Sequence, residues 1–186
     1  MKTPDRTGSG VAPWTYTTTA KMLHWGLALL LVGMVALGWY MVSIEKQPNS
    51  GWYFDLHKSA GITILGLVLL RLVWRITHRP RHLPSSLPKW QTALATSTQT
   101  LLYVVMFIMP ITGLTGALLS KDGVSFFGIT LPNLVPNHDL SEQLFAVHGV
   151  IVWILIGLAS IHVAGALKHL LVDRDGVFQR MWPTKN

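Results

Sequence analysis

Four long apolar segments decide what this chain of 186 residues can fold into. The first covers residues 22–42, which is long enough for a helix to cross the roughly 30 Å hydrocarbon core of a bilayer. It contains no Asp, Glu, Lys or Arg. The other three cover about residues 56–76, 93–119 and 144–168. None of them alternates apolar and polar residues as a barrel strand does. Because a helix satisfies its own backbone hydrogen bonds in lipid, the sequence predicts an all-α fold, a transmembrane four-helix bundle.

The regions beside these spans define the expected domain organisation. The first span is too long for the apolar core of a signal peptide, and no A-x-A cleavage site follows it, so we expect it to be retained. Residues 21–183 then form a single transmembrane domain, preceded by an N-terminal segment, residues 1–20, and followed by a tail, residues 184–186. Only 12% of the residues are charged, about half the share that is usual in a soluble domain.

The basic residues are distributed unevenly between the two sides of the expected bundle. Of the 15 Lys and Arg residues, 12 lie near the two termini or the linker between the second and third spans. Only Lys46, Lys58 and Lys121 lie on the opposite side, beside five acidic residues, which gives that side a net charge of −2. The positive-inside rule therefore predicts that both termini are cytoplasmic. The net charge of +7 reflects this topology, so we expect membrane lipid as the partner of the basic side and no nucleic acid.

Histidine is the ionisable residue that recurs inside the spans. The chain has eight histidines and no cysteine, which excludes thiolate metal sites and the covalent attachment of c-type haem. Four histidines lie within or at the edge of a span, where an ionisable residue is a functional candidate: His24, His57, His148 and His162. The direction of each span sorts them by depth. His24 and His162 fall in the cytoplasmic half of the bilayer, and His57 and His148 fall in the outer half.

Two histidines from different helices at each of two depths form the arrangement that two b-type haems require. Haem iron takes an axial ligand on each face of the macrocycle, and imidazole is a common one. The last span would supply one ligand to each haem, and the first and second spans would supply one each. The alternatives are a site for two metal ions, a proton relay and a structural polar network. No carboxylate lies inside a span, which argues against a site for a hard cation.

Two arginines lie near the cytoplasmic end of the second span. Arg71 follows His57 by 14 residues, so it shares a helix face with that histidine at the opposite depth. We predict that Arg71 binds a propionate of the cytoplasmic haem, because a guanidinium pairs well with a carboxylate. The alternative is that its side chain extends to lipid phosphates, and this is the simpler interpretation of Arg75, one turn further on.

Several segments of the sequence resemble the bacterial cytochrome b561 family. They are LHWGLALLL at 23–31, GWYFDLHKSAGITILGLVLLRLVWR at 51–75, VHGVIVW at 147–153 and SIHVAGALKHLLVDRDGVFQRMWP at 160–183. The resemblance extends over roughly residues 17–183 and implies a four-helix, di-haem b protein of the bacterial inner membrane. It also implies that the four histidines named above are the axial ligands, His24 with His162 and His57 with His148. Members of the family exchange electrons with quinone, some as superoxide oxidases and others as cytochrome b subunits of dehydrogenases.

The resemblance implies electron transfer through the membrane. We expect an electron to enter at the outer haem, from superoxide or from a redox partner protein, and to reduce ubiquinone or another membrane quinone at the cytoplasmic haem. His169 lies seven residues after His162 and, with Arg71 or Arg75, is a candidate to hydrogen-bond a quinone carbonyl. The alternatives for His169 are a C-terminal helix cap and a lipid-facing residue. The activity itself stays open between superoxide oxidation and electron relay for a partner. A haem-binding or structural membrane protein without turnover is the alternative from another class.

Overall fold

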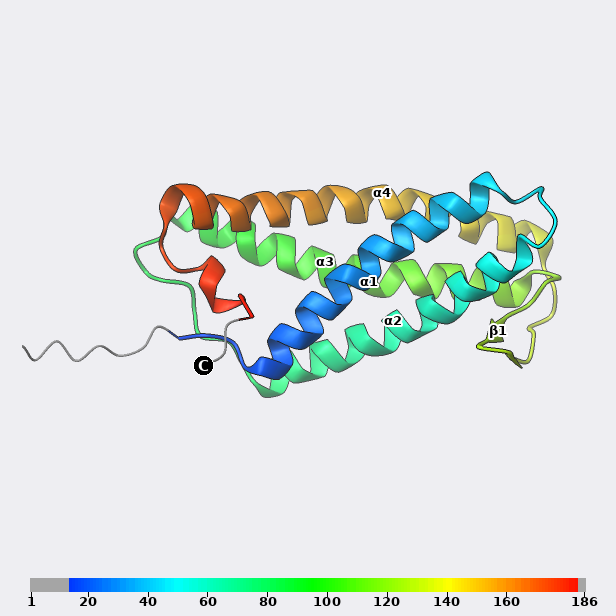
Figure 1. The fold of residues 1–186 in the computed structure, drawn as a ribbon, viewed down its shortest axis with the longest axis horizontal. Coiled ribbons are helices and arrows are strands. Elements are labelled where there is room, and N and C mark those ends of the chain that lie inside the picture. Colours follow the sequence, from blue (N-terminus) through cyan, green and yellow to red (C-terminus); the bar gives the residue numbers. More distant parts are fainter. Residues whose placement is uncertain (1–13, 184–186) are drawn as a thin grey trace, which may run out of the picture.

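The structure is a computed structural model that describes residues 14–183, most of which lie in four long helices. Residues 1–13 and 184–186, which include most of the expected N-terminal segment and the whole tail, lie outside the described residues. The helices are Thr18–Ser43 (α1), Gly51–Thr77 (α2), Lys89–Leu119 (α3) and His138–Lys168 (α4), as Figure 1 shows. All four are long and apolar enough to cross a membrane. The predicted all-α, four-helix transmembrane fold is confirmed.

Two helices, α1 and α4, begin at polar capping residues, several residues before the apolar segments that predicted them. Thr17 Oγ1 accepts a hydrogen bond from Ala20 N–H at 3.3 Å, before the first turn of α1. Asn137 Oδ1 accepts one from Leu140 N–H at 3.1 Å, at the start of α4. Such caps satisfy N–H groups that have no partner inside the helix. Residues 18–20, expected in the N-terminal segment, therefore belong to α1, and residues 138–143, expected in a linker, belong to α4.

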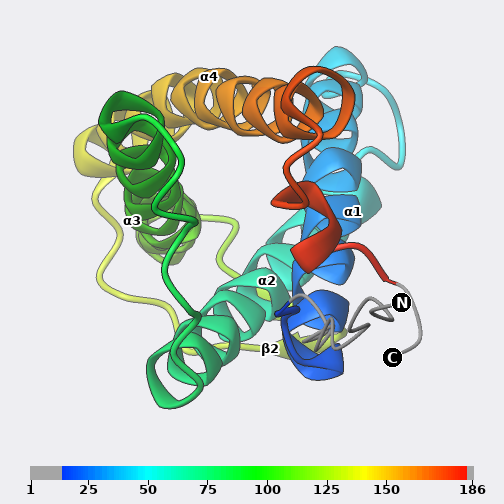
Figure 2. The same ribbon diagram turned by 90° about the vertical axis from the view of Figure 1, so that its left-hand side faces the viewer.

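Helices that follow one another in the sequence pack against one another in space. α3 packs most closely against α4, followed by α1 against α2 and α2 against α3. Viewed along the bundle, the four helices occupy the corners of a square (Figure 2). The most buried apolar cluster is formed by Leu27 of α1 with Ile64 and Val68 of α2. This contact fixes α1 against α2 close to the middle of both helices.

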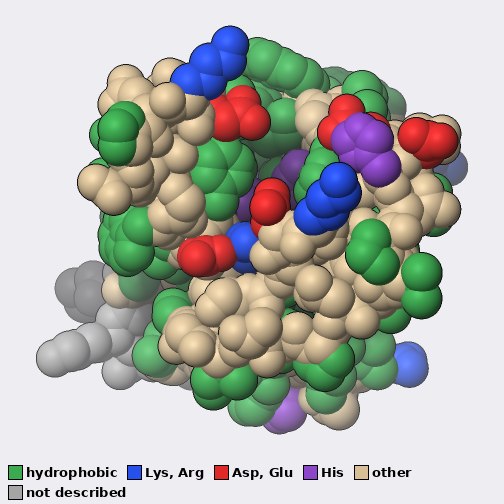
Figure 3. All heavy atoms as spheres, turned by 90° about the vertical axis from the view of Figure 1, so that its right-hand side faces the viewer, with side chains coloured by type: hydrophobic (Ala, Val, Ile, Leu, Met, Phe, Trp, Pro, Cys, Tyr) green, Lys and Arg blue, Asp and Glu red, His purple; other side chains and the backbone are tan. Residues whose placement is uncertain are grey.

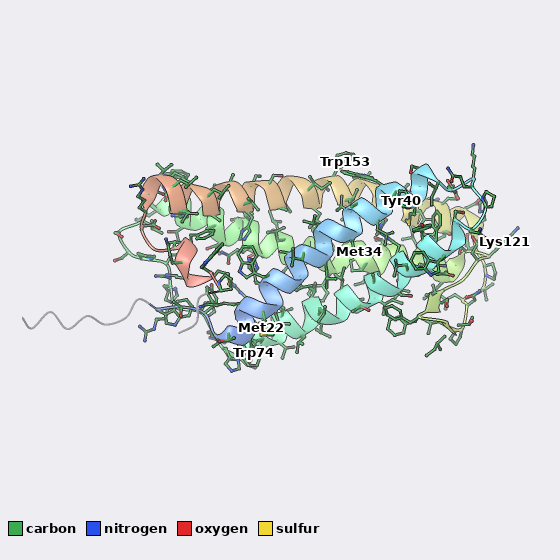
Figure 4. The ribbon with its side chains drawn as sticks, in the orientation of Figure 1. Met22, Met34, Tyr40, Trp74, Lys121 and Trp153 are labelled. Atoms are coloured by element: carbon green, nitrogen blue, oxygen red, sulfur yellow. The ribbon has the colours of Figure 1, made fainter. Side chains whose placement is uncertain are left out.

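Large apolar side chains cover the outside of the bundle. Val32 is 72% exposed and Trp153 is 63% exposed. Figure 4 shows Trp153 and Met22 on the outer surface of the bundle. An apolar surface of this extent is a liability in water, whereas in a bilayer it faces lipid. The exposure pattern therefore agrees with the membrane-spanning lengths of the helices.

The two ends of the bundle carry different connections (Figure 1). The terminus end consists of residues 14–17, 78–88 and 169–183. The hairpin end consists of residues 44–50 and 120–137, in which the strands Ser125–Phe126 (β1) and Ile129–Thr130 (β2) pair antiparallel. The described chain thus begins and ends on the same side of the bundle. This arrangement agrees with the even number of helices that cross it.

Side chains that neighbour His57 hold the hairpin onto α2. The Ser59 hydroxyl accepts a hydrogen bond from Phe127 N–H at 3.0 Å and lies 3.1 Å from the Ser125 carbonyl oxygen. Lys58 Nζ donates to the Gly123 carbonyl oxygen at 3.1 Å. Ser59 is only 2% exposed, so these contacts are shielded from solvent. The loop is therefore fixed to the bundle beside one of the four candidate histidines.

The chain folds back over the terminus end after α4. It passes through a π-helical turn, His169–Asp173 (η1), and a short 3-10 helix, Phe178–Arg180 (η2). The Arg180 carbonyl then accepts a hydrogen bond from Tyr16 N–H at 3.0 Å, and the Met181 carbonyl accepts one from Trp25 Nε1 at 2.9 Å. Residues 180–182 therefore run beside the first turns of α1.

Candidate functional site

The four candidate histidines form two pairs in the structure. His24 of α1 faces His162 of α4, with ring centroids 6.1 Å apart and ring planes at 75°. His57 of α2 faces His148 of α4, with centroids 6.2 Å apart and planes at 79°. Along α4 the two pairs are separated by 14 residues, or about 21 Å of helix. The bundle therefore presents two imidazole pairs at two depths, one nearer the terminus end and one nearer the hairpin end.

The separation within each pair fits a metal between the rings. A metal lies about 2 Å from the imidazole nitrogen that binds it and the ring centre lies about 1 Å behind that nitrogen, so two rings on opposite faces of one iron have centroids about 6 Å apart. Both observed distances agree with this value. Direct contact between two imidazoles would allow a shorter separation. The pairs therefore fit the axial ligation of haem iron.

A backbone hydrogen bond fixes the protonation of the His148 ring. His148 Nδ1 lies 2.8 Å from the Met109 carbonyl oxygen of α3. A carbonyl can only accept, so Nδ1 is the donor and Nε2 is the nitrogen available to a metal. Metal-binding histidines in proteins are usually oriented in this way, by a hydrogen bond from the nitrogen that does not bind the metal. This hydrogen bond prepares His148 to be a ligand through Nε2.

The third helix makes room for this ring with a glycine. A Cβ atom at Gly113 would lie 2.9 Å from both Cε1 and Nδ1 of His148, closer than real Cβ contacts come. Pro110 lies inside the same helix and removes one of its backbone hydrogen bonds. This helix contains no histidine, yet it shapes the surroundings of the His148 ring. The proximity of Pro110 and Gly113 in the sequence is the signal that could have indicated its contribution.

The His57 ring is enclosed but has no hydrogen-bond partner. Its Nδ1 atom is buried and forms no hydrogen bond with any group in the described part of the chain. The ring lies against α1, where a Cβ at Gly38 would be 3.4 Å from His57 Cε1. Buried polar atoms are almost always satisfied, so an unpaired one calls for a specific explanation. Nδ1 lies 3.9 Å from the same Cβ position at Gly38, so it is packed against α1 and Nε2 is the nitrogen left to bind a metal.

Arg71 belongs to the pair nearer the terminus end. Its positive charge interacts with both His24 and His162. Its Nε donates a hydrogen bond to Tyr103 Oη of α3 at 3.1 Å. The hydroxyl of Tyr103 thus holds the guanidinium in place beside the imidazoles. This is the depth at which the sequence placed Arg71.

A small cavity at the terminus end contains both arginines of α2. Its walls include Arg71, Arg75, Tyr103 and His78, and its volume is about 20 Å³. Arg75 Nη2 donates to Gln99 Oε1 at 3.0 Å, and its guanidinium lies 5.8 Å from the centre of the Tyr103 ring. A cavity of this size holds about one water molecule. Arg75 therefore faces Gln99 and Tyr103 of α3.

His169 lies in a separate cluster of charged side chains beyond α4. Its Nδ1 is 2.7 Å from Asp175 Oδ2 and 3.4 Å from Asp173 Oδ2, and Lys168 also pairs with Asp173. Burial alone raises the pKa of the Asp175 carboxyl, but hydrogen bonds from Val177 N–H and His169 bring that pKa below its usual value. Within the described residues, no hydrogen bond joins His169 to Arg71 or Arg75. The structure thus brings the two arginines together and places His169 in the turn that ends α4.

The lysines of the hairpin end are partly neutralised. Lys58 forms an ion pair with Asp55 at 2.7 Å in addition to its bond to Gly123. Lys121 points away from the bundle (Figure 4). Figure 3 looks onto this end and shows acidic and lysine side chains around a hollow in which histidine is visible. The surface of the hairpin end is therefore of mixed charge, in agreement with the small negative net charge of its sequence.

The fold and these side chains define a class of protein, a membrane-spanning helical bundle with paired histidines suited to bind haem. The family model for prokaryotic cytochrome b561 matches residues 15–184, and the chain belongs to this family. It is 33% identical over 181 residues to cytochrome b561 homolog 2 of Escherichia coli (strain K12), covering 91% of this chain and 92% of that protein. It is 27% identical over 183 residues to cytochrome b561 homolog 1 of the same organism, covering 91% and 98%. It is also 28% identical over 170 residues to a probable superoxide oxidase, CybB, of Yersinia pestis, covering 88% and 93%.

Membership of this family establishes the general function and the location of the protein. The chain is a haem b protein that transfers electrons, and it is a multi-pass protein of the bacterial inner membrane. The resemblance of the sequence to the cytochrome b561 family is confirmed.

Proposed function

We propose that this protein binds two haem b groups, one between His24 and His162 and one between His57 and His148. The observation that carries the proposal is the pair of imidazole separations, 6.1 and 6.2 Å, at two depths of one bundle. The haems, when bound, supply the one-electron redox chemistry. The chain supplies the ligands and, at His148, the orientation of the ring by Met109. At the terminus end Arg71 neutralises a propionate.

We further propose that the terminus end is cytoplasmic and that quinone is reduced there. The support is the excess of basic residues near both termini and in the linker 78–88, which the positive-inside rule assigns to the cytoplasm. Arg75 is the proposed contact for a quinone carbonyl, since its guanidinium lies at the cytoplasmic end of α2. The adjoining cavity of about 20 Å³ is too small for a quinone ring, so the ring would reach Arg75 from the bilayer. His169 remains a second candidate, through the nitrogen that Asp175 does not bind.

Superoxide is the proposed electron donor at the hairpin end. A relative from Yersinia pestis carries the name probable superoxide oxidase, and its similarity covers 88% of this chain. In the proposed reaction two superoxide anions are each oxidised to dioxygen and release one electron. One quinone takes up these two electrons together with two protons and becomes the quinol. The His57–His148 pair lies nearer this end and would hold the haem that receives the electrons.

A second candidate donor is a redox partner protein that docks at the hairpin end. The observation that favours it is the charge of this end. Acidic side chains surround the hollow, and Lys58 is already paired with Asp55, so little positive charge is free to attract an anion (Figure 3). Electrostatic steering of superoxide requires positive potential at the point of entry. A basic partner protein would instead be attracted by the acidic surface.

Superoxide pulses distinguish the two donors. We expect the oxidised, purified protein with added quinone to show rapid haem reduction on mixing with superoxide, followed by quinol formation, and superoxide dismutase to abolish both. The measurement is stopped-flow absorption in the haem bands, with quinol quantified after the reaction. A protein that stays oxidised under superoxide but is reduced by a partner fraction would be an electron relay. A purified protein without a Soret band would contradict haem binding altogether and favour a structural role.

A further inference from the structure

Lys21 is a buried cation that the function proposed above does not use. It lies in the first turns of α1 and is only 4% exposed. No hydrogen bond or ion pair within the described part of the chain holds its ammonium group. A lysine that is buried without a partner is unusual, because the loss of hydration disfavours the charged group. An unpaired buried lysine therefore indicates a bound anion.

The position of Lys21 relates it to the His24–His162 pair. Lys21 and His24 are three residues apart in α1, so they are neighbours on adjacent turns of the helix. The His24 ring faces His162 of α4 across the bundle. Lys21 therefore lies one turn nearer the terminus end than this inward-directed ring.

The C-terminal segment runs along the part of α1 that carries Lys21. Its hydrogen bonds to Tyr16 and Trp25 lie on either side of Lys21 in the sequence, and the rings of Trp25 and Trp182 are 5.8 Å apart. Residues 180–182 therefore pass this part of α1 as a cover. A cation that is enclosed in this way interacts strongly with an anion inside the same enclosure, because little water screens the charges.

We propose that Lys21 is the counter-ion of a propionate of the haem held by His24 and His162. The inference rests on the haem binding proposed above. Haem carries two carboxylates, and Arg71 is assigned to one of them. Lys21 provides a second positive charge at the same depth, from α1 rather than α2. Lys21 is a positioning residue in this proposal: it orients the macrocycle and tunes its potential without touching the iron.

The test measures the reduction potential of a single haem. In a His57→Ala background the haem at the hairpin end is removed, so the remaining haem titrates alone. We expect Lys21→Met to lower the potential of that haem, because the loss of a nearby positive charge disfavours the reduced state. A tenfold change in the one-electron reduction equilibrium corresponds to about 59 mV, and we expect a shift of this order. Lys21→Arg keeps the charge and should restore most of the potential.

The matched control removes the positive charge of a lysine that is exposed to solvent. Lys89 begins α3 at the same end of the bundle and is exposed, so Lys89→Met should leave the potential unchanged. Equal potentials in the Lys21→Met, Lys89→Met and background proteins would overturn the inference. Loss of the haem in Lys21→Met that Lys21→Arg reverses would support it, whereas loss in both would show that packing and not charge matters. A wild-type protein without haem would overturn the proposed function, and this inference with it.

Discussion

Replacing His148 with alanine is expected to halve the haem content of the purified protein. The pairing of His148 with His57, at a ring separation of 6.2 Å, assigns both to one haem, and a b-type haem has no covalent link that would retain it. His57→Ala should cause the same loss, and the double variant should lose no more than either single one. His24→Ala and His162→Ala should each remove the other haem. Haem per protein is measured by pyridine haemochrome absorption, and the identity of the haem lost by redox titration.

The control for this series is a histidine outside the pairs. His138 begins α4 at the hairpin end and is exposed, so His138→Ala should retain both haems. The pairing makes the effects of two substitutions non-additive within a pair and additive between pairs. Haem content that stays at two in all four single variants would show that the ligands are wrong. Losses that add within a pair would show that the pairing is wrong.

Replacing Gly113 with alanine is expected to destabilise the haem at the hairpin end although Gly113 is not a ligand. The new Cβ would lie 2.9 Å from Nδ1 and Cε1 of His148, so the ring must move. That movement breaks its hydrogen bond to the Met109 carbonyl, which is 2.8 Å long. Overpacking in a tight site costs about 1–3 kcal/mol. We expect lower occupancy and a shifted potential for this haem only, measured by redox titration, with a fall in the thermal midpoint.

A glycine with free space provides the matched control. Gly157 lies in α4 and a Cβ there would meet nothing within 4 Å. Replacing glycine with alanine in a helix also brings a gain in helix propensity of about 1 kcal/mol. Gly157→Ala measures this gain, which the steric cost of the new Cβ in Gly113→Ala must exceed. Gly113→Leu should give a larger loss than Gly113→Ala. Equal haem content and potential in the Gly113→Ala and Gly157→Ala proteins would show that α3 does not position His148.

The sequence predicted the helices well because each prediction depended on local properties. Hydropathy over about 20 residues is sufficient to recognise a membrane span. The spans at 22–42 and 93–119 lie within α1 and α3, and the differences are at helix ends, where Thr17 and Asn137 begin α1 and α4 earlier. Hydropathy ignores capping, which is why it placed residues 18–20 and 138–143 outside the helices.

The depth of the histidines could also be read from the sequence, but their surroundings could not. The alternating direction of the spans and the rise of a helix gave two levels, and the structure brings the rings together at both. The contribution of α3 was missed, because the Met109 carbonyl is a backbone group and Gly113 acts by having no side chain. Pro110 marks this part of α3 in the sequence, but neither property can be assigned to the site before it is known which ring lies opposite. Gln99 and Tyr103 were missed for the same reason, since ordinary residues acquire a role only through their neighbours.

The sequence by itself determined the membrane-spanning class, the number of helices, and the depth of each histidine. These follow from hydrophobicity and helical geometry, which act along the chain. Only the tertiary structure decided which helices meet, so it alone showed that α3 orients His148 and that Tyr103 of α3 holds Arg71. It also showed that Lys21 is buried. The physical reason is that packing and burial depend on groups far apart in the sequence, and their effects on a side chain exist only once the helices have come together.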